Sequence, residues 1–250
     1  MHHVLITGGA AGIGLAIART FLANGAAVLV CDVDEEALAQ AQAALPGLRT
    51  VPCDVSQQAD VSRLFEAVER ELGRIDVLVN NVGIGGPTLP AAELPSAEWQ
   101  RVLDINLTGT FEITRRAIPY LQRTAGTIIN MSSAAGRYGY PNRIAYSVSK
   151  WGLIGFTKTL AMELGGDGIS VNAILPGAVG GDRFDRVIAG RAERSGRSID
   201  EEIAQGLATQ SIKRVVDPSH VAELALFLTT PSGRSISGQA LPIDCDLQRG

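Results

Sequence analysis

The fold is decided near the start of the chain by residues 4–14, which read Val-Leu-Ile-Thr-Gly-Gly-Ala-Ala-Gly-Ile-Gly. Residues 4–7 are apolar and predict a buried strand, and residues 13–24 have the periodicity of an amphipathic helix. The glycines between them let the backbone turn tightly, and the N-terminus of the helix offers free N–H groups and a partial positive charge. This strand, turn and helix predict a place where a pyrophosphate lies against the backbone.

Short apolar runs alternate with periodic segments along the rest of the chain. The expected strands are residues 4–7, 27–31, 48–53, 77–80, 127–131, 170–175 and 236–244. The expected helices are residues 13–24, 35–44, 60–72, 98–124 with a break inside, 146–164 and 220–230. Strands rich in Val, Ile and Leu are typical of parallel sheets covered by helices on both faces. We expect an α/β fold of the Rossmann type, a doubly wound parallel sheet in three α/β/α layers.

Length and composition exclude several classes of protein. The chain has 250 residues, of which 46% are hydrophobic and 19% charged, and its formal net charge is −4. These values fit one soluble domain over residues 1–250 and argue against a dedicated nucleic-acid-binding protein. No run approaches the roughly 18 apolar residues of a membrane span, and the chain enters a strand without a signal-peptide pattern. We expect a cytoplasmic protein with no membrane partner.

The cysteines and histidines predict no metal site. Cys31, Cys53 and Cys245 have no CxxC or other metal-ligand spacing, and neither have the three histidines. Cys31 and Cys53 could lie close together if their strands are neighbours. We interpret all three cysteines as reduced thiols of a cytosolic protein.

A polar cluster follows the expected strand at residues 127–131. Tyr146 and Lys150 are about one helical turn apart, so both side chains leave the same face of the helix. An ammonium near a phenol favours the phenolate, which can exchange a proton with an alcohol or carbonyl oxygen. Ser133 adds a hydroxyl that can hydrogen-bond the same oxygen. A Tyr–Lys pair at this spacing is common on surface helices, so the hypothesis depends on the rest of the cluster.

The Tyr146-x-x-x-Lys150 pair, with Ser133 thirteen residues before the tyrosine, resembles the catalytic signature of the short-chain dehydrogenases/reductases. The resemblance extends from residue 7 to about residue 244. It implies that Tyr146 is the acid–base group, that Ser133 binds the reacting oxygen, and that Lys150 stabilises the phenolate and touches the nicotinamide ribose. Asn106 stands where the family keeps an asparagine that holds a helix irregularity and a water leading to the lysine. Asn106 could equally interrupt its helix by bonding its own backbone.

The same resemblance implies a nicotinamide cofactor. It places the glycine-rich turn against the pyrophosphate through Gly8, Gly12, Ile13 and Gly14. Asp32 follows 18 residues after Gly14, where a carboxylate accepts the ribose hydroxyls of NAD and repels the 2′-phosphate of NADP. No Lys or Arg lies in the turn or at residues 33–35, so we predict NAD. Asp32 could instead cap the next helix, a role that Asp34 could fill equally well.

Other positions of the family pattern follow later strands. The implied cofactor contacts there are Asp54 and Val55, Asn81 and Gly83, and Pro176, Gly177 and Val179. An Asp after a strand is also common in turns, and we interpret Asn81 as mainly structural. Gly181 occupies the place of a threonine whose hydroxyl binds the nicotinamide carboxamide in related sequences, so that contact cannot form here.

The substrate is left open by the sequence, because specificity in this family lies in a variable lid, here at about residues 182–216. Arg143, three residues before Tyr146, could grip a carboxylate, sulfonate or phosphate, and Arg183 or Arg186 on the lid could complete a clamp. A salt bridge to the lid or to another subunit would explain Arg143 equally well. The arginines of the lid could also form a solvated face.

We predict an NAD-dependent oxidoreductase that interconverts a secondary alcohol and a ketone, acting on a small anionic or sugar-like molecule. The resemblance also implies a homotetramer. It further shows a departure from the family's Asp-Gly-Gly ending, which here reads Asp244-Cys245-Asp246. Three alternatives remain: an NADP-linked reductase of 3-oxoacyl thioesters, a non-catalytic NAD-sensing module, and a scaffolding protein.

Overall fold

The computed structural model describes residues 1–248, without the side chains of residues 182, 183, 191 and 194. Within these residues a single sheet of seven parallel strands has the order β3-β2-β1-β4-β5-β6-β7. The strands are β1 (His3–Thr7), β2 (Ala27–Asp32), β3 (Arg49–Pro52), β4 (Val77–Asn80), β5 (Thr127–Met131), β6 (Ser170–Pro176) and β7 (Ala240–Ile243). The strand order reverses between β1 and β4, where such sheets form a crevice at the carboxyl ends of their strands.

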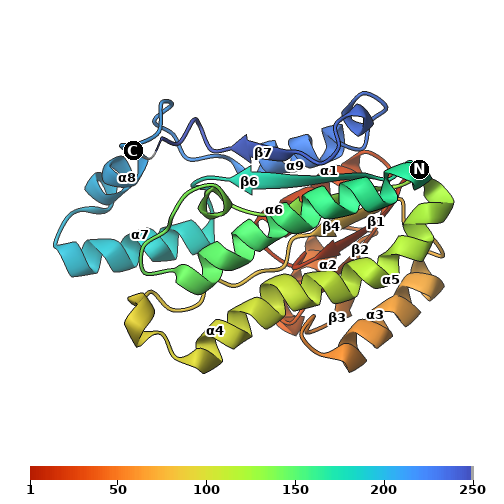
Figure 1. The fold of residues 1–250 in the computed structure, drawn as a ribbon, viewed down its shortest axis with the longest axis horizontal. Coiled ribbons are helices and arrows are strands. Elements are labelled where there is room, and N and C mark those ends of the chain that lie inside the picture. Colours follow the sequence, from red (N-terminus) through yellow and green to blue (C-terminus); the bar gives the residue numbers. More distant parts are fainter. Residues whose placement is uncertain (249–250) are drawn as a thin grey trace.

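Helices cover both faces of this sheet (Figure 1). One layer contains α1 (Gly12–Ala23), α2 (Glu35–Ala44) and α9 (Pro218–Phe227), and the other contains α3 (Gln58–Glu71), α5 (Gly109–Thr124) and α6 (Ile144–Leu164). Successive strand residues point to opposite layers, so Val4 and Ile6 pack with the first and Leu5 with the second, all three fully buried. The expected doubly wound, three-layer fold is confirmed.

The long periodic segment at residues 98–124 is interrupted, as expected. It forms α4 (Ser96–Leu103), a π-helical turn η2 (Asp104–Thr108) and α5. The last strand spans only residues 240–243 of the predicted residues 236–244, because Gly238, just before it, has a left-handed φ of 71°. The other strands agree with prediction to within a residue or so. Buried parallel strands are easily located because their apolar runs are short and sharply bounded.

The segment predicted as a lid forms two helices, α7 (Asp182–Ser195) and α8 (Ile199–Leu207). They project beyond the carboxyl ends of β6 and β7 (Figure 1). The start of α8 is fixed by a capping box, in which Ser198 and Glu201 satisfy each other's backbone N–H groups. No helix of residues 1–248 is both long enough and apolar enough to cross a membrane.

The three cysteines are free thiols. Cys31, on β2, and Cys53, just after β3, are both buried at neighbouring positions of the sheet. The hydrogen bond with Cys53, together with burial, raises the pKa of the Cys31 thiol well above its usual value. Cys31 is therefore a protonated core side chain rather than a reactive thiolate.

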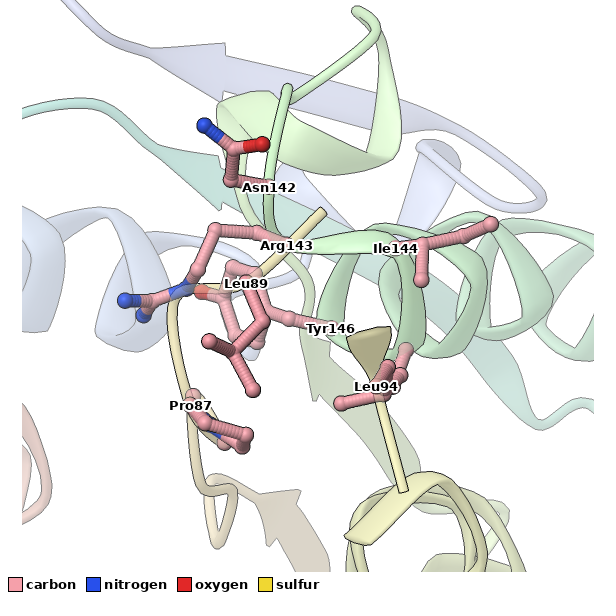
Figure 2. Close-up of a pocket in the computed structure, with 10 residues that line it drawn as sticks. Pro87, Leu89, Leu94, Asn142, Arg143, Ile144 and Tyr146 are labelled. Atoms are coloured by element: carbon pink, nitrogen blue, oxygen red, sulfur yellow. The ribbon is translucent and has the colours of Figure 1, made fainter. Parts of the chain in front are cut away.

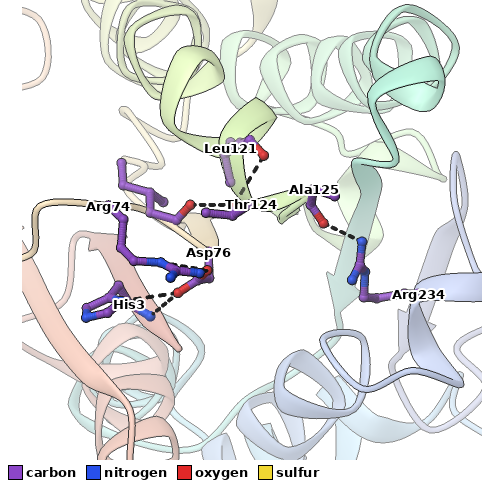
Figure 3. Close-up of polar contacts among 8 residues, drawn as sticks. His3, Arg74, Asp76, Leu121, Thr124, Ala125 and Arg234 are labelled. Carbon is purple, nitrogen blue, oxygen red and sulfur yellow. Dashed lines mark hydrogen bonds and ion pairs between the residues drawn. The ribbon is translucent and has the colours of Figure 1, made fainter. Parts of the chain in front are cut away.

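Asp76 organises the amino-terminal edge of the sheet (Figure 3). Its carboxylate accepts the backbone N–H of His3 at 2.7 Å and the Nε of Arg74 at 3.1 Å. Its backbone joins β1 to β5, because its N–H donates to the carbonyl of His3 and its carbonyl accepts from Thr127. Burial raises the pKa of the Asp76 carboxyl, but the hydrogen bonds from Arg74 and His3 lower it by more, so this pKa lies below its usual value.

We predict that Asp76→Asn lowers the free energy of unfolding at pH 7 by about 2 kcal/mol, because hydrogen bonds to a charged group are worth about 1.5–3 kcal/mol. A carboxyl with a lowered folded-state pKa stabilises the protein fully above its unfolded pKa of about 3.9. This stabilisation is lost as the pH falls through the lower folded-state value. Wild type should therefore lose more stability on acidification than the variant. Urea denaturation between about pH 7 and pH 3 measures this difference.

Glu66→Gln is the control, because Glu66 is an exposed carboxylate on α3. It should change neither the stability nor its pH dependence by more than about 0.5 kcal/mol. Equal behaviour of the two variants would show that Asp76 does not hold this edge together.

Candidate active site

Lys150 lies on α6 against the carboxyl end of β5. Its residue is only 4% exposed, and its Nζ donates to the main-chain carbonyl of Met131 at 2.8 Å. The Oγ of Ser132, the next residue, donates to the carbonyl of Lys150 at 2.8 Å. These two bonds fix the helix to the end of the strand, so the buried ammonium is held in one place.

Tyr146 lies one turn earlier on the same helix. The Nζ of Lys150 is 5.7 Å from the centre of the Tyr146 ring, and the Cζ of Arg143 is also 5.7 Å from it. Ser147 donates to the carbonyl of Ala135 at 3.0 Å and so ties the start of α6 to the turn that follows β5. The tyrosine ring therefore has two cations beside it at the strand ends.

Ser133 follows β5 in an extended conformation, and its Oγ accepts the N–H of Ala135 at 3.1 Å. This bond caps the short 3₁₀ turn η3 (Ala134–Gly136). The hydroxyl keeps its own proton for donation, and its predicted hydrogen bond to a substrate oxygen is compatible with this arrangement.

Asn106 lies in the π-helical turn η2 and is fully buried. Its Oδ1 accepts the N–H of Ile84 at 2.8 Å, and its Nδ2 donates to the carbonyl of Ile84 and to the Oγ of Ser149, both at 2.9 Å. The expected helix irregularity is therefore present at Asn106. The side chain joins η2, the segment after β4, and α6 beside Lys150.

The glycine-rich turn has the tight geometry that its sequence predicts. Gly8 and Gly12 have φ angles of 63° and 53°, a region that favours glycine. A Cβ on Gly14 would lie 2.1 Å from the carbonyl oxygen of Gly8, so no side chain fits there. Asn81 donates to the carbonyls of Thr7 and Gly8 at 3.1 and 2.7 Å, which is the structural role expected for it.

Asp32 ends β2 beside this turn. Its Oδ2 accepts the N–H of Ala10 at 3.2 Å, and its Oδ1 accepts the N–H of Val33 at 2.8 Å. Asp34 caps α2 by accepting the N–H of Ala37 at 2.9 Å. Of the two roles considered for Asp32, the cap therefore belongs to Asp34, and Asp32 borders the predicted pyrophosphate turn.

Comparison with known proteins agrees with this geometry. Residues 2–191 match the family described as short chain dehydrogenase. The chain belongs to the short chain dehydrogenase family.

Among the relatives of this chain is the 2-dehydro-3-deoxy-L-rhamnonate dehydrogenase (NAD(+)) of Sphingomonas sp. (strain SKA58). The two are 43% identical over 173 residues, which are 69% of this chain and 70% of the relative. The actinorhodin polyketide ketoreductase, in a crystal structure with NADPH, has a TM-score of 0.92 and 35% identity, over 97% of this chain and 95% of that chain. The NAD⁺-bound xylitol dehydrogenase has a TM-score of 0.90 and 31% identity, over 97% of both chains.

The remaining positions predicted to contact a cofactor lie at the ends of β3, β4 and β6. Asp54 forms a turn by accepting the N–H and hydroxyl of Ser56 at 2.9 and 2.7 Å, and the side chain of Val55 is buried. A Cβ on Gly83 would lie 3.1 Å from the Nζ of Lys150. Gly83 therefore borders the lysine directly.

After Pro176, which ends β6, Gly177 donates its N–H to Ile243 at 3.1 Å, and Val179 forms a bridge with Val216. Gly181 has a φ of 122°, a conformation that residues with a Cβ rarely adopt. A threonine at position 181 would therefore be strained, so the hydroxyl that related sequences carry there could not be restored by a simple substitution.

Of the predicted substrate arginines, Arg143 lies beside Tyr146, and the exposed Arg186 lies on α7. The side chain of Arg183 lies outside the described residues. Among residues 1–248 no three His, Cys, Asp or Glu side chains gather where they could hold a metal ion. A cavity of about 520 Å³ at the end of β7 is lined by Arg137, Arg214 and His220, with none of the predicted catalytic residues.

The structure adds three groups that sequence reasoning missed. They are the hydroxyls of Ser132 and Ser149 and the carbonyl of Met131, which hold Lys150 and Asn106 in place. Ser149 directly precedes Lys150, which is a hint at a shared role. The role of the Met131 carbonyl has no signal in the sequence, because every residue has a main-chain carbonyl.

We predict that Asn106→Ala lowers the free energy of unfolding by about 2–3 kcal/mol, because the N–H and carbonyl of Ile84 lose their partners. Urea denaturation followed by tryptophan fluorescence measures the loss. Asn24→Ala is the control, since Asn24 is exposed and its side-chain amide donates to the nearby carbonyl of Thr20. Equal losses in the two variants would contradict a structural role for the Asn106 network.

Proposed function

We propose that this short chain dehydrogenase is an NAD-dependent oxidoreductase that interconverts a secondary alcohol and a ketone. The observation that carries the proposal is the buried Lys150 ammonium, held 5.7 Å from the Tyr146 ring at the carboxyl ends of the strands. Ser133 and Asn106 complete the set of polar groups that this chemistry needs.

Each group has a defined part in the proton transfer. In the oxidative direction Tyr146, as phenolate, removes the hydroxyl proton of the substrate, and Ser133 donates a hydrogen bond to the same oxygen. Lys150 stabilises the phenolate electrostatically. Asn106 holds the π-helical turn through which a water can return the proton to solvent. The carbinol carbon loses its hydrogen with two electrons, and a nicotinamide supplies the acceptor when bound.

The glycine-rich turn fits a dinucleotide. A Cβ added to Gly12 would meet no atom within 4 Å, so this glycine faces open space at the start of α1. Free N–H groups at a helix start favour a pyrophosphate there. We assign the other cofactor contacts to Gly8, Ile13, Gly14, Asp32, Asp54, Val55, Asn81, Gly83, Tyr146, Lys150, Pro176, Gly177 and Val179.

Asp32 favours NAD over NADP. Its carboxylate borders the glycine-rich turn, where it would accept ribose hydroxyls and repel a 2′-phosphate. The names of the rhamnonate and xylitol relatives, which cite NAD⁺, support this choice, whereas the polyketide ketoreductase was solved with NADPH. An NADP-linked reductase of 3-oxoacyl thioesters is therefore the second candidate function.

We further propose that residues 1–250 form one domain in which residues 182–216 close over a small substrate, in a cytoplasmic homotetramer. The two relatives named above as dehydrogenases support a polyhydroxylated substrate. Phe111, Val148 and Trp151, on α5 and α6, are 41–50% exposed and could pack against a second copy.

We predict that Tyr146→Phe lowers turnover by about a hundredfold or more, because the acid–base group is lost, while NADH binding is retained. The assay is NADH formation across a panel of sugars, sugar acids, polyols and cyclic alcohols, with NADH binding followed by fluorescence. Tyr138→Phe is the control, because the Tyr138 hydroxyl bonds the carbonyl of Leu247. Near-full activity of Tyr146→Phe would contradict the proposed reaction. NADH binding by wild type without turnover of any substrate would favour an NAD-sensing module.

We also predict that wild type binds NADH about tenfold or more tightly than NADPH, and that Asp32→Ser removes this preference. Asp34→Ser is the control, because it removes a neighbouring charge while serine keeps the helix cap. Fluorescence titration with both nucleotides measures the ratio. Equal binding of NADPH by wild type would overturn the choice of NAD and favour the second candidate function.

A further inference from the structure

One side of Tyr146 is closed by the chain itself. The N–H of Leu89, in the segment after β4, donates to the carbonyl of Asn142, just before α6, at 2.9 Å. Leu89 and Arg143 line the narrow space between these two segments, which is too small for a water molecule (Figure 2). A substrate therefore has to approach Tyr146 from another side, and residues 182–216 are the part of the chain predicted to cover it.

The two helices of this predicted lid, α7 and α8, are joined by a buried carboxylate. Glu202, on α8, is only 5% exposed. Its Oε1 accepts the hydroxyl of Ser195, the last residue of α7, at 2.5 Å and the Nη1 of Arg197 at 2.9 Å. Separating the helices would break the bonds of a buried charge, which is costly. A contact that holds the end of α8 therefore also positions α7.

The end of α8 is held by the carboxyl-terminal segment at residues 245–248, which we call the strap. Residues 209–212, which follow α8, form an antiparallel bridge with the strap. Backbone hydrogen bonds join the two segments, among them a bond of 3.1 Å from the N–H of Ser211 to the carbonyl of Asp246. The strap therefore lies against the root of the lid.

The other end of the lid offers less resistance to movement. Gly181, which directly precedes α7, has a φ of 122°, a conformation that residues with a Cβ rarely adopt. A Cβ added to Gly181 would meet no atom within 4 Å, so the backbone there is not packed against other elements. The contact with the strap is therefore the one that can fix the position of the two helices.

Asp246 has an unfavourable backbone conformation within the strap. Its φ is 57°, as is that of Cys245 before it. The left-handed region is disfavoured for residues with a Cβ, although aspartate tolerates it better than most. In this conformation the Oδ2 of Asp246 accepts the hydroxyl of Ser211, and its Oδ1 accepts the amide of Gln248. A glycine would suit the backbone better but could form neither bond.

We propose that Asp246 is a positioning residue for the lid. Its bond to Ser211 holds α8, and with it α7, in the place where both helices project beyond the carboxyl ends of β6 and β7. This role explains why a left-handed position is occupied by a carboxylate rather than by a glycine. The inference rests on the proposed function in one respect, because it takes residues 182–216 as the cover of the substrate.

The test is hydrogen–deuterium exchange of residues 182–207, measured by mass spectrometry on the full-length protein without cofactor. Asp246→Gly should raise exchange in the lid about fivefold, because a charge-assisted bond at an exposed site is lost. Trypsin cleavage after the exposed Arg186 should accelerate by a similar factor. The free energy of unfolding in urea should stay close to that of wild type, because relief of the left-handed backbone offsets the lost bond.

Two further variants test the bond itself. Asp246→Asn should keep most of the protection, because asparagine tolerates a left-handed backbone and its amide oxygen can accept the Ser211 hydroxyl. Ser211→Ala should match Asp246→Gly, and the double variant should add little to either. Cys245→Gly is the control, because it gives the strap the same backbone freedom and keeps the carboxylate. It should leave exchange and cleavage in the lid as in wild type.

Unchanged exchange in the lid of Asp246→Gly would overturn the inference. An equal rise in Cys245→Gly would also overturn it, since backbone freedom alone would then explain the effect.

The proposed function is tested separately, by the kinetics of alcohol oxidation with NAD⁺. In Asp246→Gly the KM of the alcohol should rise about fivefold while kcat changes by less, because a loosened cover weakens substrate binding more than the chemical step. Faster exchange in the lid with an unchanged KM would support the contact and reject residues 182–216 as the substrate cover. Faster exchange in a protein that oxidises no alcohol would support the contact and reject the reaction.

Discussion

The hydrogen bond from the Lys150 ammonium to the Met131 carbonyl is the interaction on which the rest of the site depends. A charge that is 4% exposed is tolerated only where fixed acceptors replace water, so this lysine has to sit against the end of β5. The same strand end bonds back to the helix through Ser132. Ser149, the residue before Lys150, receives the amide of Asn106 and so extends the network to the π-helical turn. The hydrogen bonds around the buried Lys150 ammonium therefore fix how β5, α6 and the π-helical turn η2 lie relative to one another.

This close approach explains why particular positions have no side chain. A Cβ on Gly136 would lie 2.4 Å from the Oγ of Ser132, and one on Gly83 would lie 3.1 Å from the Nζ of Lys150. Both glycines lie where the backbone has to pass close to this network. The result is a closely packed platform that presents Tyr146 at the carboxyl edge of the sheet, where the proposed proton transfer needs it.

Much of the fold could be predicted from the sequence, because buried parallel strands have short, sharply bounded apolar runs and the glycine-rich turn has a distinctive spacing. The Tyr146–Lys150 spacing likewise predicted a shared helix face. The partners of Asn106 could not be predicted, because Ile84 lies in an irregular segment that only the tertiary fold brings near. The left-handed backbone of Cys245 and Asp246, both with φ of 57°, could not be predicted from these two residues themselves, since neither is a glycine. For Arg143 the sequence left a salt bridge and a ligand contact open; in the described residues its guanidinium bonds Thr88 and forms no salt bridge, and the ligand contact stays a prediction.

The central claim is that this platform separates a proton, which leaves through Tyr146, from a hydride, which leaves the carbinol carbon. The most direct measurement is mass spectrometry of the reduced cofactor after oxidation of a secondary alcohol that carries deuterium on its carbinol carbon. The account predicts that the deuterium is found in NADH and that none is released to water. Deuterium in the solvent, with unlabelled NADH, would mean that the carbon-bound hydrogen leaves as a proton, and it would contradict the account.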